Sequence, residues 1–390
     1  MRPLTSRKPK VMLPVAGRPF LEHIILRAHS AGIDSFVIVA GYCADHIRSH
    51  LGDGVRLDVH IDYAFQERQL GTGHALLAAR DLAEDSFVVL NGDVLADTND
   101  LKRVLRTSAP AVAAMRVSDP GRYGVFLLEG GSMKQVVEKS PNPPSDLANA
   151  GIYLFNRKIF EALEKVLPSE RREIELTDGL SALALQEKVG VVQLESWMEI
   201  GRPWDILTAN EALLQEVEPQ VEGEVEPGAT LKGRVSVGLN TIIRSGSYII
   251  GPVIIGKGCD IGPNCYIRPG TSLGKNVRVG NAVEVKNSTI MDGTKIAHLS
   301  YVGDSVIGEG CNFGAGTICA NLRHDKGSIK SFVKNEQVDS GRRKLGAIMG
   351  DGVKTGINTT IYPGTVIDSG FLGRPAAVLK GFVESGKQKE

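Results

Sequence analysis

The chain has 390 residues, more than one ordinary domain needs, and its formal net charge is zero. The balanced charge gives no electrostatic reason to expect a nucleic acid as partner, and no apolar run reaches the about 20 residues that span a bilayer. Five cysteines, none of them in a CxxC pair, indicate neither a zinc site nor a disulfide framework. Charge, apolar runs and cysteines together lead us to expect a cytoplasmic protein that binds neither nucleic acid nor membrane.

Glycine content divides the chain into two parts. Residues 1–216 contain 16 glycines, whereas the shorter remainder, residues 217–390, contains 29. Between the two parts runs an acidic stretch with Pro219 and Pro227, which is typical of a linker. We therefore predict two domains, residues 1–216 and residues 217–390.

The first part alternates strand-like and helix-like segments. Short apolar runs at residues 36–42 and 86–93 end in polar or glycine residues, as buried parallel strands do. Around them, residues 18–32, 72–83 and 100–108 carry apolar side chains at helical spacing. This order predicts a Rossmann-like α/β domain whose ligand site lies at the carboxyl ends of its strands.

Three features of the first part suit nucleotidyl transfer, which depends on positioning and on neutralising phosphate charge. Lys10 could supply a cation, and Gly71, Thr72 and Gly73 begin a helix whose free N–H groups could bind a base or a phosphate. Asp93 ends a strand, where it could bind a metal ion. Alone each signal is weak, because a strand-end aspartate is more often a turn residue or a helix cap.

The second part repeats with a six-residue period. From Val225 to Ala297 an aliphatic or small residue recurs at every sixth position, often followed by glycine. This pattern predicts a parallel β-helix with three hexads in each triangular coil and the repeated residue pointing inward. The glycine and proline content excludes a helical interpretation.

The period is then disturbed. From Ala297 the next aliphatic positions are Val302, Ile307 and Phe313, which are two steps of five residues followed by one of six. Between residues 321 and 346 the pattern vanishes. A repeat that gives up its regular packing indicates a functional site.

Residues at this disturbance suit acyl transfer to an amine. Coils of about 18 residues could bring His298 and Tyr301 close to Arg268 and Lys286. A neutral imidazole can accept the proton that an ammonium must lose before it attacks a thioester. The two cations could hold a phosphorylated acceptor. A lone histidine on a β-helix is otherwise more often a solvated turn residue.

These motifs carry a family resemblance. The second part resembles the left-handed β-helix acetyltransferases, and the whole chain resembles the bifunctional sugar-1-phosphate nucleotidylyltransferase/acetyltransferases that make UDP-N-acetylglucosamine. The resemblance implies acetyl-CoA and glucosamine-1-phosphate, then UTP or another nucleoside triphosphate, as substrates, with Mg²⁺ as cofactor and a homotrimer as the assembly. It implies that His298 in "IAHLSYVGD" is the catalytic base, that Arg268, Lys286, Tyr301 and Asn312 bind the sugar phosphate, and that Ala315 and Asn321 line the acetyl-CoA site.

Residues 322–345 carry seven Lys or Arg against three Asp or Glu. They are either a solvated loop or a basic arm that binds the phosphates of coenzyme A, with Lys326 and Lys330 as candidates. The motif "SGRRKLGA" is similar to that of archaeal members of the family.

In the first part the same resemblance assigns Lys10 to the triphosphate as a catalytic residue and Asp93 to Mg²⁺. Further binding roles fall to the nucleobase set Gln66, Gly71 and Thr72, and to the sugar-phosphate set Gly124, Glu138, Lys139 and Asn149. Glu199 stands where the family usually has Asp or Asn as its second metal ligand, and its longer side chain changes the geometry.

The start of the chain also differs from the family pattern. A strand and a glycine loop of the form LAAGxGTRxRPLT precede the segment that here begins "MRPLTSRKPK". A chain that begins at Met1 is therefore expected to have a gap in its sheet, and its nucleotidyl transfer is expected to depend on residues before Met1.

Three alternatives remain open from the sequence. The chain could be a sugar-1-phosphate nucleotidyltransferase for glucose, mannose or N-acetylglucosamine, whose β-helix serves only for oligomerisation. It could catalyse acetyl transfer alone, or it could bind sugar nucleotides without catalysis.

Overall fold

The computed structural model describes residues 1–386 and contains two compact units. One unit is Leu21–Glu199, and the other joins Met1–Phe20 to Ile200–Glu390. The first residues of the chain therefore pack with its second part. The functional division at residue 216 stays a prediction.

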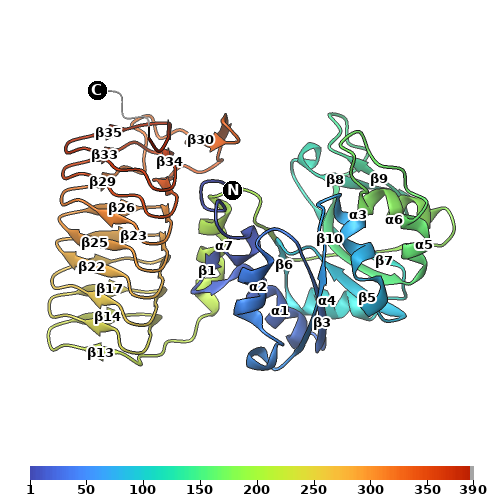
Figure 1. Ribbon diagram of the computed structural model, residues 1–390, viewed down its shortest axis with the longest axis horizontal. Coiled ribbons are helices and arrows are strands. Elements are labelled where there is room, and N and C mark those ends of the chain that lie inside the picture. Colours follow the sequence, from blue (N-terminus) through green and yellow to red (C-terminus); the bar gives the residue numbers. More distant parts are fainter. Residues whose placement is uncertain (387–390) are drawn as a thin grey trace. The chain divides into compact units, whose positions relative to one another are not determined.

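The unit Leu21–Glu199 is built around a mixed sheet in the order β11-β7-β10-β8-β9, in which β5 also pairs with β10 (Figure 1). Strands β5 and β7 both run antiparallel to β10, so the apolar run at residues 86–93, compared above to a buried parallel strand, has an antiparallel neighbour. The strands of this sheet are β5 (Ser86–Leu90), β7 (Ala111–Arg116), β8 (Gly124–Glu129), β9 (Ser132–Glu138), β10 (Leu147–Asn156) and β11 (Gly190–Gln193).

Two further strand pairs complete this unit. Parallel strands β3 (Ser35–Ala40) and β4 (His60–Phe65) form a separate sheet, and β6 (Val94–Ala96) pairs antiparallel with β12 (Trp197–Glu199). Within residues 1–386, β3 and β4 are hydrogen bonded to no other strand, and several of their apolar side chains are half-buried. The strands therefore do not form one continuous sheet.

Helices cover these strands, and those at residues 20–30, 72–78 and 98–105 lie where apolar spacing predicted helices. They are α1 (Phe20–Ser30), α2 (Ala44–Leu51), α3 (Thr72–Ala78), α4 (Thr98–Leu105), α5 (Lys158–Leu163) and α6 (Leu176–Ala184), with short 3-10 turns at Val55–Leu57, Arg80–Leu82 and Pro120–Arg122. Helix α4 begins where Asp97 accepts a hydrogen bond from the Asn99 N–H, which satisfies one free donor of its first turn. None of the helices in the described part of the chain is long and apolar enough to cross a membrane.

The second unit contains the predicted parallel β-helix, whose coils are stacked in Figure 1. Its β13 face consists of β13 (Glu224–Val225), β16 (Ile242–Ile243), β19 (Asp260–Ile261), β22 (Arg278–Asn281), β25 (Lys295–His298) and β28 (Asn312–Phe313). Its β14 face consists of β14 (Thr230–Lys232), β17 (Tyr248–Ile250), β20 (Tyr266–Ile267), β23 (Glu284–Lys286), β26 (Tyr301–Gly303), β29 (Ile318–Cys319), β33 (Thr360–Ile361) and β35 (Val378–Leu379).

The third face, the β15 face, is covered by other segments of the same unit. It consists of β15 (Val235–Val237), β18 (Val253–Ile255), β21 (Thr271–Leu273), β24 (Thr289–Ile290), β27 (Val306–Ile307), β32 (Ile348–Met349), β34 (Val366–Ile367) and β36 (Phe382–Val383). Buried Asn210 of α7 (Asp205–Leu213) binds the Ala16 N–H, the Gly270 carbonyl and the Ser272 hydroxyl. This side chain joins the first residues of the chain to the β-helix.

The first residues carry further short elements. These are a 3-10 turn at Lys10–Met12 and the strand pair β1 (Pro14–Val15) and β2 (Arg18–Pro19), while a second 3-10 turn, Leu214–Glu216, extends α7. Leu4 and Leu13 are fully buried, and the ammonium of buried Lys8 pairs with Glu309 on the β-helix.

The six-residue period fails earlier than the sequence indicated. Strand pairing places Ile290 next to Leu273 and Ile296 next to Val279, so each coil shortens from 18 to 17 residues at this point. Ile290 and Ile296 belong to the core of the β-helix, and the prediction that Met291 and Ala297 point inward was wrong. Met291 and Ala297 are apolar or small, as inward-facing residues of the repeat are, so the sequence did not reveal that the inward position had shifted by one residue.

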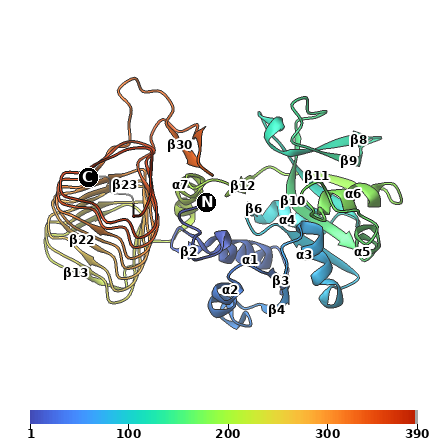
Figure 2. The ribbon, with the colours of Figure 1, turned by 45° about the horizontal axis from the view of Figure 1, so that its top comes forward.

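Residues 322–345 leave the coil as an antiparallel hairpin of β30 (Lys330–Val333) and β31 (Glu336–Asp339), which projects from the β-helix in Figure 2. Leu322 and Lys344 form an antiparallel bridge at its base. The regular coil resumes at β32, as the sequence predicted.

Candidate functional site

Neighbouring coils of the β14 face bring together four residues that the sequence predicted for acetyl transfer. Strands β23 and β26 pair so that Glu284 lies opposite Tyr301, and the guanidinium of Arg268 lies 2.8 Å from the Glu284 carboxylate. Lys286 ends β23. The amide of Asn321, one coil further on, donates a 3.0 Å hydrogen bond to the Tyr301 hydroxyl. Arg268, Lys286, Tyr301 and Asn321 therefore form one cluster.

Asp304 holds this cluster together, and sequence reasoning missed it. Its side chain is only 3% exposed and accepts hydrogen bonds from Lys286 Nζ (3.2 Å), Asn287 Nδ2 (2.8 Å) and Asn321 Nδ2 (2.5 Å). It lies 18 residues after Lys286, so counting coils from that lysine could have found it.

Lys344 is a third cation beside the cluster and was also missed. It lies at the base of the hairpin, where the Leu345 N–H donates to the Asn321 carbonyl. The nearby ammonium of Lys286 and the guanidinium of Arg268 lower the pKa of Lys344, because a second positive charge is unfavourable there. Lys344, Lys286 and Arg268 therefore give the cluster three neighbouring cations.

The pKa of Tyr301 is raised, chiefly by burial and then by the negative charges of Asp304 and Glu284. Its hydroxyl therefore stays protonated and can donate a hydrogen bond to a ligand.

His298 lies at the corner that joins the β13 and β14 faces, three positions before Tyr301. Its side chain is exposed at the end of β25, and His298 is the pairing partner of Asn281 in the preceding coil. The next coil repeats this corner, where the Gly316 N–H donates to the His298 carbonyl. Ala315, predicted for acetyl-CoA, directly precedes Gly316 and so lies beside His298. The predicted base and one predicted acetyl-CoA residue are thus neighbours.

The remaining predicted residues of this part lie elsewhere. Asn312 is exposed on β28 in the β13 face, where it pairs with Lys295, so one chain does not place it beside Tyr301. Lys326 and Lys330 are exposed on the segment that leaves the coil, the latter at the start of β30. Their roles stay predictions.

In the other unit, Gln66 lies against the turn that starts α3. Its amide donates to the Gly71 carbonyl and also contacts His74 Nδ1, both at 3.0 Å. Gly71 has φ of 100°, and a Cβ there would lie 2.5 Å from the Ile174 carbonyl oxygen, so the turn requires glycine.

Two groups at the start of α3 already have partners within the protein. The Gly73 N–H donates to the Ile174 carbonyl, and the Thr72 hydroxyl accepts from the Leu176 N–H. The expectation that the Gly73 N–H is free for a ligand was therefore wrong, because residues 174–176 pack against this turn.

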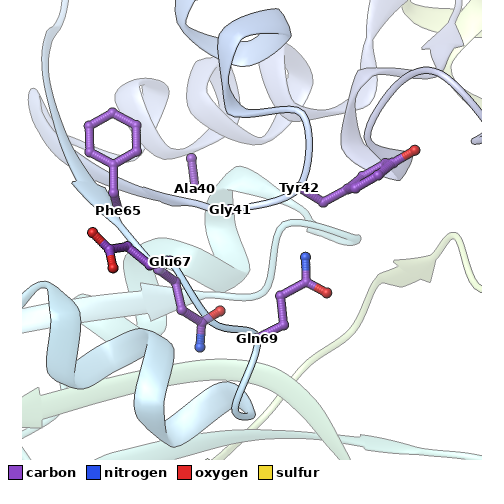
Figure 3. Close-up of a pocket in the computed structure, with 7 residues that line it drawn as sticks. Ala40, Gly41, Tyr42, Phe65, Glu67 and Gln69 are labelled. Atoms are coloured by element: carbon purple, nitrogen blue, oxygen red, sulfur yellow. The ribbon is translucent and has the colours of Figure 1, made fainter.

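Gln66 also lines a cavity of about 460 Å³ at the carboxyl ends of β3 and β4 (Figure 3). The other lining residues are Ala40, Gly41, Tyr42, Phe65, Glu67 and Gln69. Aromatic rings beside amide groups give this cavity surfaces for stacking and for hydrogen bonding, as a nucleobase requires.

Gly124 and Glu138 are partners on the antiparallel strands β8 and β9. A Cβ on Gly124 would lie 2.9 Å from Glu138 Oε1, so the glycine leaves the space that this carboxylate occupies. Lys139 follows with a left-handed backbone, φ 37°, and its N–H donates to the Tyr123 carbonyl. These three predicted residues are therefore adjacent.

Asn149 lies at an irregularity in β10, and its amide donates a 2.8 Å hydrogen bond to the buried Tyr153 hydroxyl. Burial chiefly raises the pKa of Tyr153, and the nearby charges of Glu138 and Asp93 raise it further. The Tyr153 hydroxyl therefore contacts one predicted sugar-phosphate residue, Asn149. From the sequence alone, Tyr153 is indistinguishable from the other core residues of its strand.

Asp93 lies directly before β6, and Glu199 ends β12, the partner strand of β6. Val94, the first residue of β6, is the partner of Glu199. Two carboxylates at the same end of a strand pair fit Mg²⁺, which binds one or two carboxylates together with water and phosphate oxygens. Lys10 belongs to the other unit, and its role toward the triphosphate stays a prediction.

Known proteins resemble this chain over both of its parts. The bifunctional protein GlmU of Methanocaldococcus jannaschii is 44% identical over 95% of this chain and 89% of its own. A bifunctional sugar-1-phosphate nucleotidylyltransferase/acetyltransferase of Sulfurisphaera tokodaii is 41% identical over 99% of this chain and 96% of its own. The chain belongs to this bifunctional family.

Two domain families and a solved structure match separate parts of this member of the bifunctional family. Residues 1–216 match the nucleotidyl transferase family, and residues 249–375 match the GMPPB C-terminal domain. The structure of a putative glucose-1-phosphate thymidylyltransferase from Bacillus anthracis matches with a TM-score of 0.51 and 26% identity, over 56% of this chain and 92% of its own. Membership of the bifunctional family argues against a β-helix that serves only for oligomerisation.

Proposed function

We propose that this chain catalyses two reactions in the cytoplasm, where their substrates are available. It transfers an acetyl group from acetyl-CoA to glucosamine-1-phosphate, and it transfers a uridylyl group from UTP to the resulting N-acetylglucosamine-1-phosphate, giving UDP-N-acetylglucosamine and pyrophosphate. The observation that carries this proposal is the cluster of Arg268, Lys286, Tyr301 and Asn321, with His298 on the adjoining corner.

In the first reaction, the His298 imidazole accepts a proton from the substrate ammonium. The free amine attacks the thioester carbonyl, the C–N bond forms, and the C–S bond breaks as coenzyme A leaves and takes up a proton. Arg268 and Lys286 hold the phosphate of the acceptor, because charge-assisted hydrogen bonds to phosphate are strong. Lys326 and Lys330 supply positive charge for the phosphates of coenzyme A.

In the second reaction, the nucleobase occupies the cavity lined by Gln66, and Glu138 and Asn149 orient the sugar phosphate. A phosphate oxygen of the sugar-1-phosphate attacks the α-phosphorus of UTP, and the bond to the leaving pyrophosphate breaks. Lys10 neutralises charge on the triphosphate. Asp93 and Glu199 would hold Mg²⁺, which when bound neutralises the developing negative charge on the phosphates.

We also propose that three copies of the chain assemble through their β-helices. Large apolar side chains are exposed at and beside the His298 corner, namely Leu299 (61%), Ile318 (41%) and Ile357 (54%). Exposed apolar residues grouped in this way are typical of a protein contact. Light scattering of the purified chain should give a mass of about three times 41.8 kDa, whereas a monomer would exclude this assembly.

Product analysis tests the two reactions separately. Purified chain is incubated with acetyl-CoA and glucosamine-1-phosphate, or with UTP, Mg²⁺ and N-acetylglucosamine-1-phosphate, and the products are identified by mass spectrometry. We expect the acetylated sugar phosphate in the first mixture and the nucleotide sugar in the second. Binding of sugar nucleotides without turnover in either mixture would overturn the proposal in favour of a non-catalytic binding protein.

A further inference from the structure

We infer that Asp304 is a positioning residue for acetyl transfer, which fixes Lys286 and Asn321 in the geometry that receives the phosphorylated acceptor. The inference rests on the proposed acetyltransferase function. Asp304 touches the proposed substrate-binding residues, and its role is exerted through them.

The contacts of Asp304 require a carboxylate. Lys286 and Asn321 both donate to Oδ2, and Asn287 donates to Oδ1. A carboxylate can accept all three hydrogen bonds because it has two acceptor oxygens and no N–H group. An asparagine of the same shape would turn an NH₂ group toward one of these donors.

The backbone holds Asp304 in this place. Its φ is 49°, a left-handed conformation that asparagine and aspartate adopt more readily than most residues. Its N–H donates to the Lys286 carbonyl at 2.9 Å, and its carbonyl accepts from the Gly346 N–H at 2.8 Å. Asn287, 17 residues earlier, has the same left-handed conformation at the same corner. Backbone hydrogen bonds to both neighbouring coils thus fix the position of the corner.

The charges around Asp304 suit a phosphate. The Lys286 side chain is 19% exposed, and the Asp304 carboxylate, 3.2 Å from its ammonium, holds that ammonium in one position. Arg268 is held in the same way by Glu284. Lys344 adds a third cation beside them. Three cations against two carboxylates leave the cluster able to bind a phosphate dianion.

Asp304 is also linked to helix α7. Asn287 donates to Glu211 Oε1 at 2.7 Å as well as to Asp304, and Arg342 at the base of the hairpin donates to the same oxygen at 2.6 Å. The carboxylate of Asp304 therefore lies in a network that joins the coil, the hairpin and α7.

The test is acetyl transfer by the full-length chain carrying Asp304→Asn. We expect the KM for glucosamine-1-phosphate to rise about tenfold or more, which corresponds to about 1.4 kcal/mol, while the Kd for coenzyme A changes less than threefold. Inorganic phosphate should also lose most of its competitive inhibition. Asp292→Asn is the matched control, because exposed Asp292 accepts the Lys275 N–H at another corner and lies outside the cluster. Its constants should equal those of the unchanged chain.

A double-mutant cycle separates positioning from general damage. If Asp304 acts through Lys286, then Asp304→Asn should raise the KM little further in a chain that already carries Lys286→Met. Independent, multiplying effects of the two substitutions on the KM would overturn the inference, as would an unchanged KM in the single Asp304→Asn variant.

A second variant keeps the test decisive if Asp304→Asn does not fold. Asn287→Gly removes one donor to Asp304, and glycine accepts the φ of 46° at that position. We expect its KM for the sugar phosphate to rise in the same direction by a smaller factor, and an unchanged KM would contradict the inference. Absence of acetyl transfer in the unchanged chain would instead refute the proposed function itself.

Discussion

The carboxylate of Glu211 on α7 accepts a 2.6 Å hydrogen bond from the guanidinium of Arg342 at the base of the inserted hairpin. The same guanidinium donates to the Thr208 hydroxyl at 2.8 Å. Helix α7 therefore anchors the segment that carries Lys326 and Lys330, the residues proposed to bind coenzyme A.

Arg342→Ala tests this anchor. We expect the Kd for coenzyme A to rise about three- to tenfold, because the hairpin must then be ordered by the ligand, which opposes binding. Isothermal titration calorimetry measures the affinity. Arg343→Ala, an exposed neighbour, is the control and should lower affinity less. Equal affinities for the Arg342→Ala variant and the unchanged chain would contradict the anchor.

Gly124→Ala tests the sugar-phosphate site of the first unit. The new methyl group would meet the Glu138 carboxylate at 2.9 Å and displace it. We expect the kcat/KM of uridylyl transfer to fall about 10- to 100-fold, since small displacements of positioning groups are costly. Acetyl transfer should not change. Gly130→Ala, where no atom lies within 4 Å of the added Cβ, is the control for a substitution of the same kind, although its φ of 57° adds some strain. Normal uridylyl transfer by Gly124→Ala would exclude the predicted role of Glu138.

Glu22 gives a pH dependence of stability that is independent of catalysis. Burial tends to raise the pKa of Glu22, but hydrogen bonds from Arg56 and His50 outweigh it and lower the pKa below its usual value. The folded state therefore favours the ionised form. This stabilisation is present above the pKa of the unfolded chain and is lost as pH falls through the lowered folded pKa.

Urea denaturation from pH 6 to pH 3.5 measures this contribution. Glu22→Gln should lower the free energy of unfolding by about 1–2 kcal/mol at pH 6, because Arg56 and His50 are partly exposed and water screens the pair. The difference from the unchanged chain should shrink toward pH 3.5. A difference that does not depend on pH would mean that Glu22 contributes through packing alone.

The β-helix could be predicted because its inward positions repeat with a fixed period, so one aliphatic residue in six is enough to recognise it. Its exact phase could not be predicted near residue 290. Ile290 and Met291 are both apolar, and only the strand pairing shows which one faces the core. Hence the coil length of 17 residues was visible only in three dimensions.

The candidate site also contains residues that could be predicted from the sequence and residues that could not. Arg268, Lys286 and Tyr301 recur at nearly one-coil intervals, so their proximity followed from counting. Lys344 lies near these residues only because the hairpin returns to the coil beside Leu322. No local sequence pattern predicts that return. Tyr153 was missed for a different reason, since a tyrosine in an apolar strand looks like core until its partner Asn149 is seen.

The central claim is that His298 is the base for acetyl transfer in this corner of the β-helix. The most direct measurement is the rate of acetyl transfer from acetyl-CoA to glucosamine-1-phosphate by His298→Ala, with His324→Ala on the exposed hairpin segment as control. Loss of a general base predicts a fall in kcat of about 100- to 10,000-fold, with uridylyl transfer unchanged and the control fully active. Acetyl transfer that persists undiminished in His298→Ala would contradict the account.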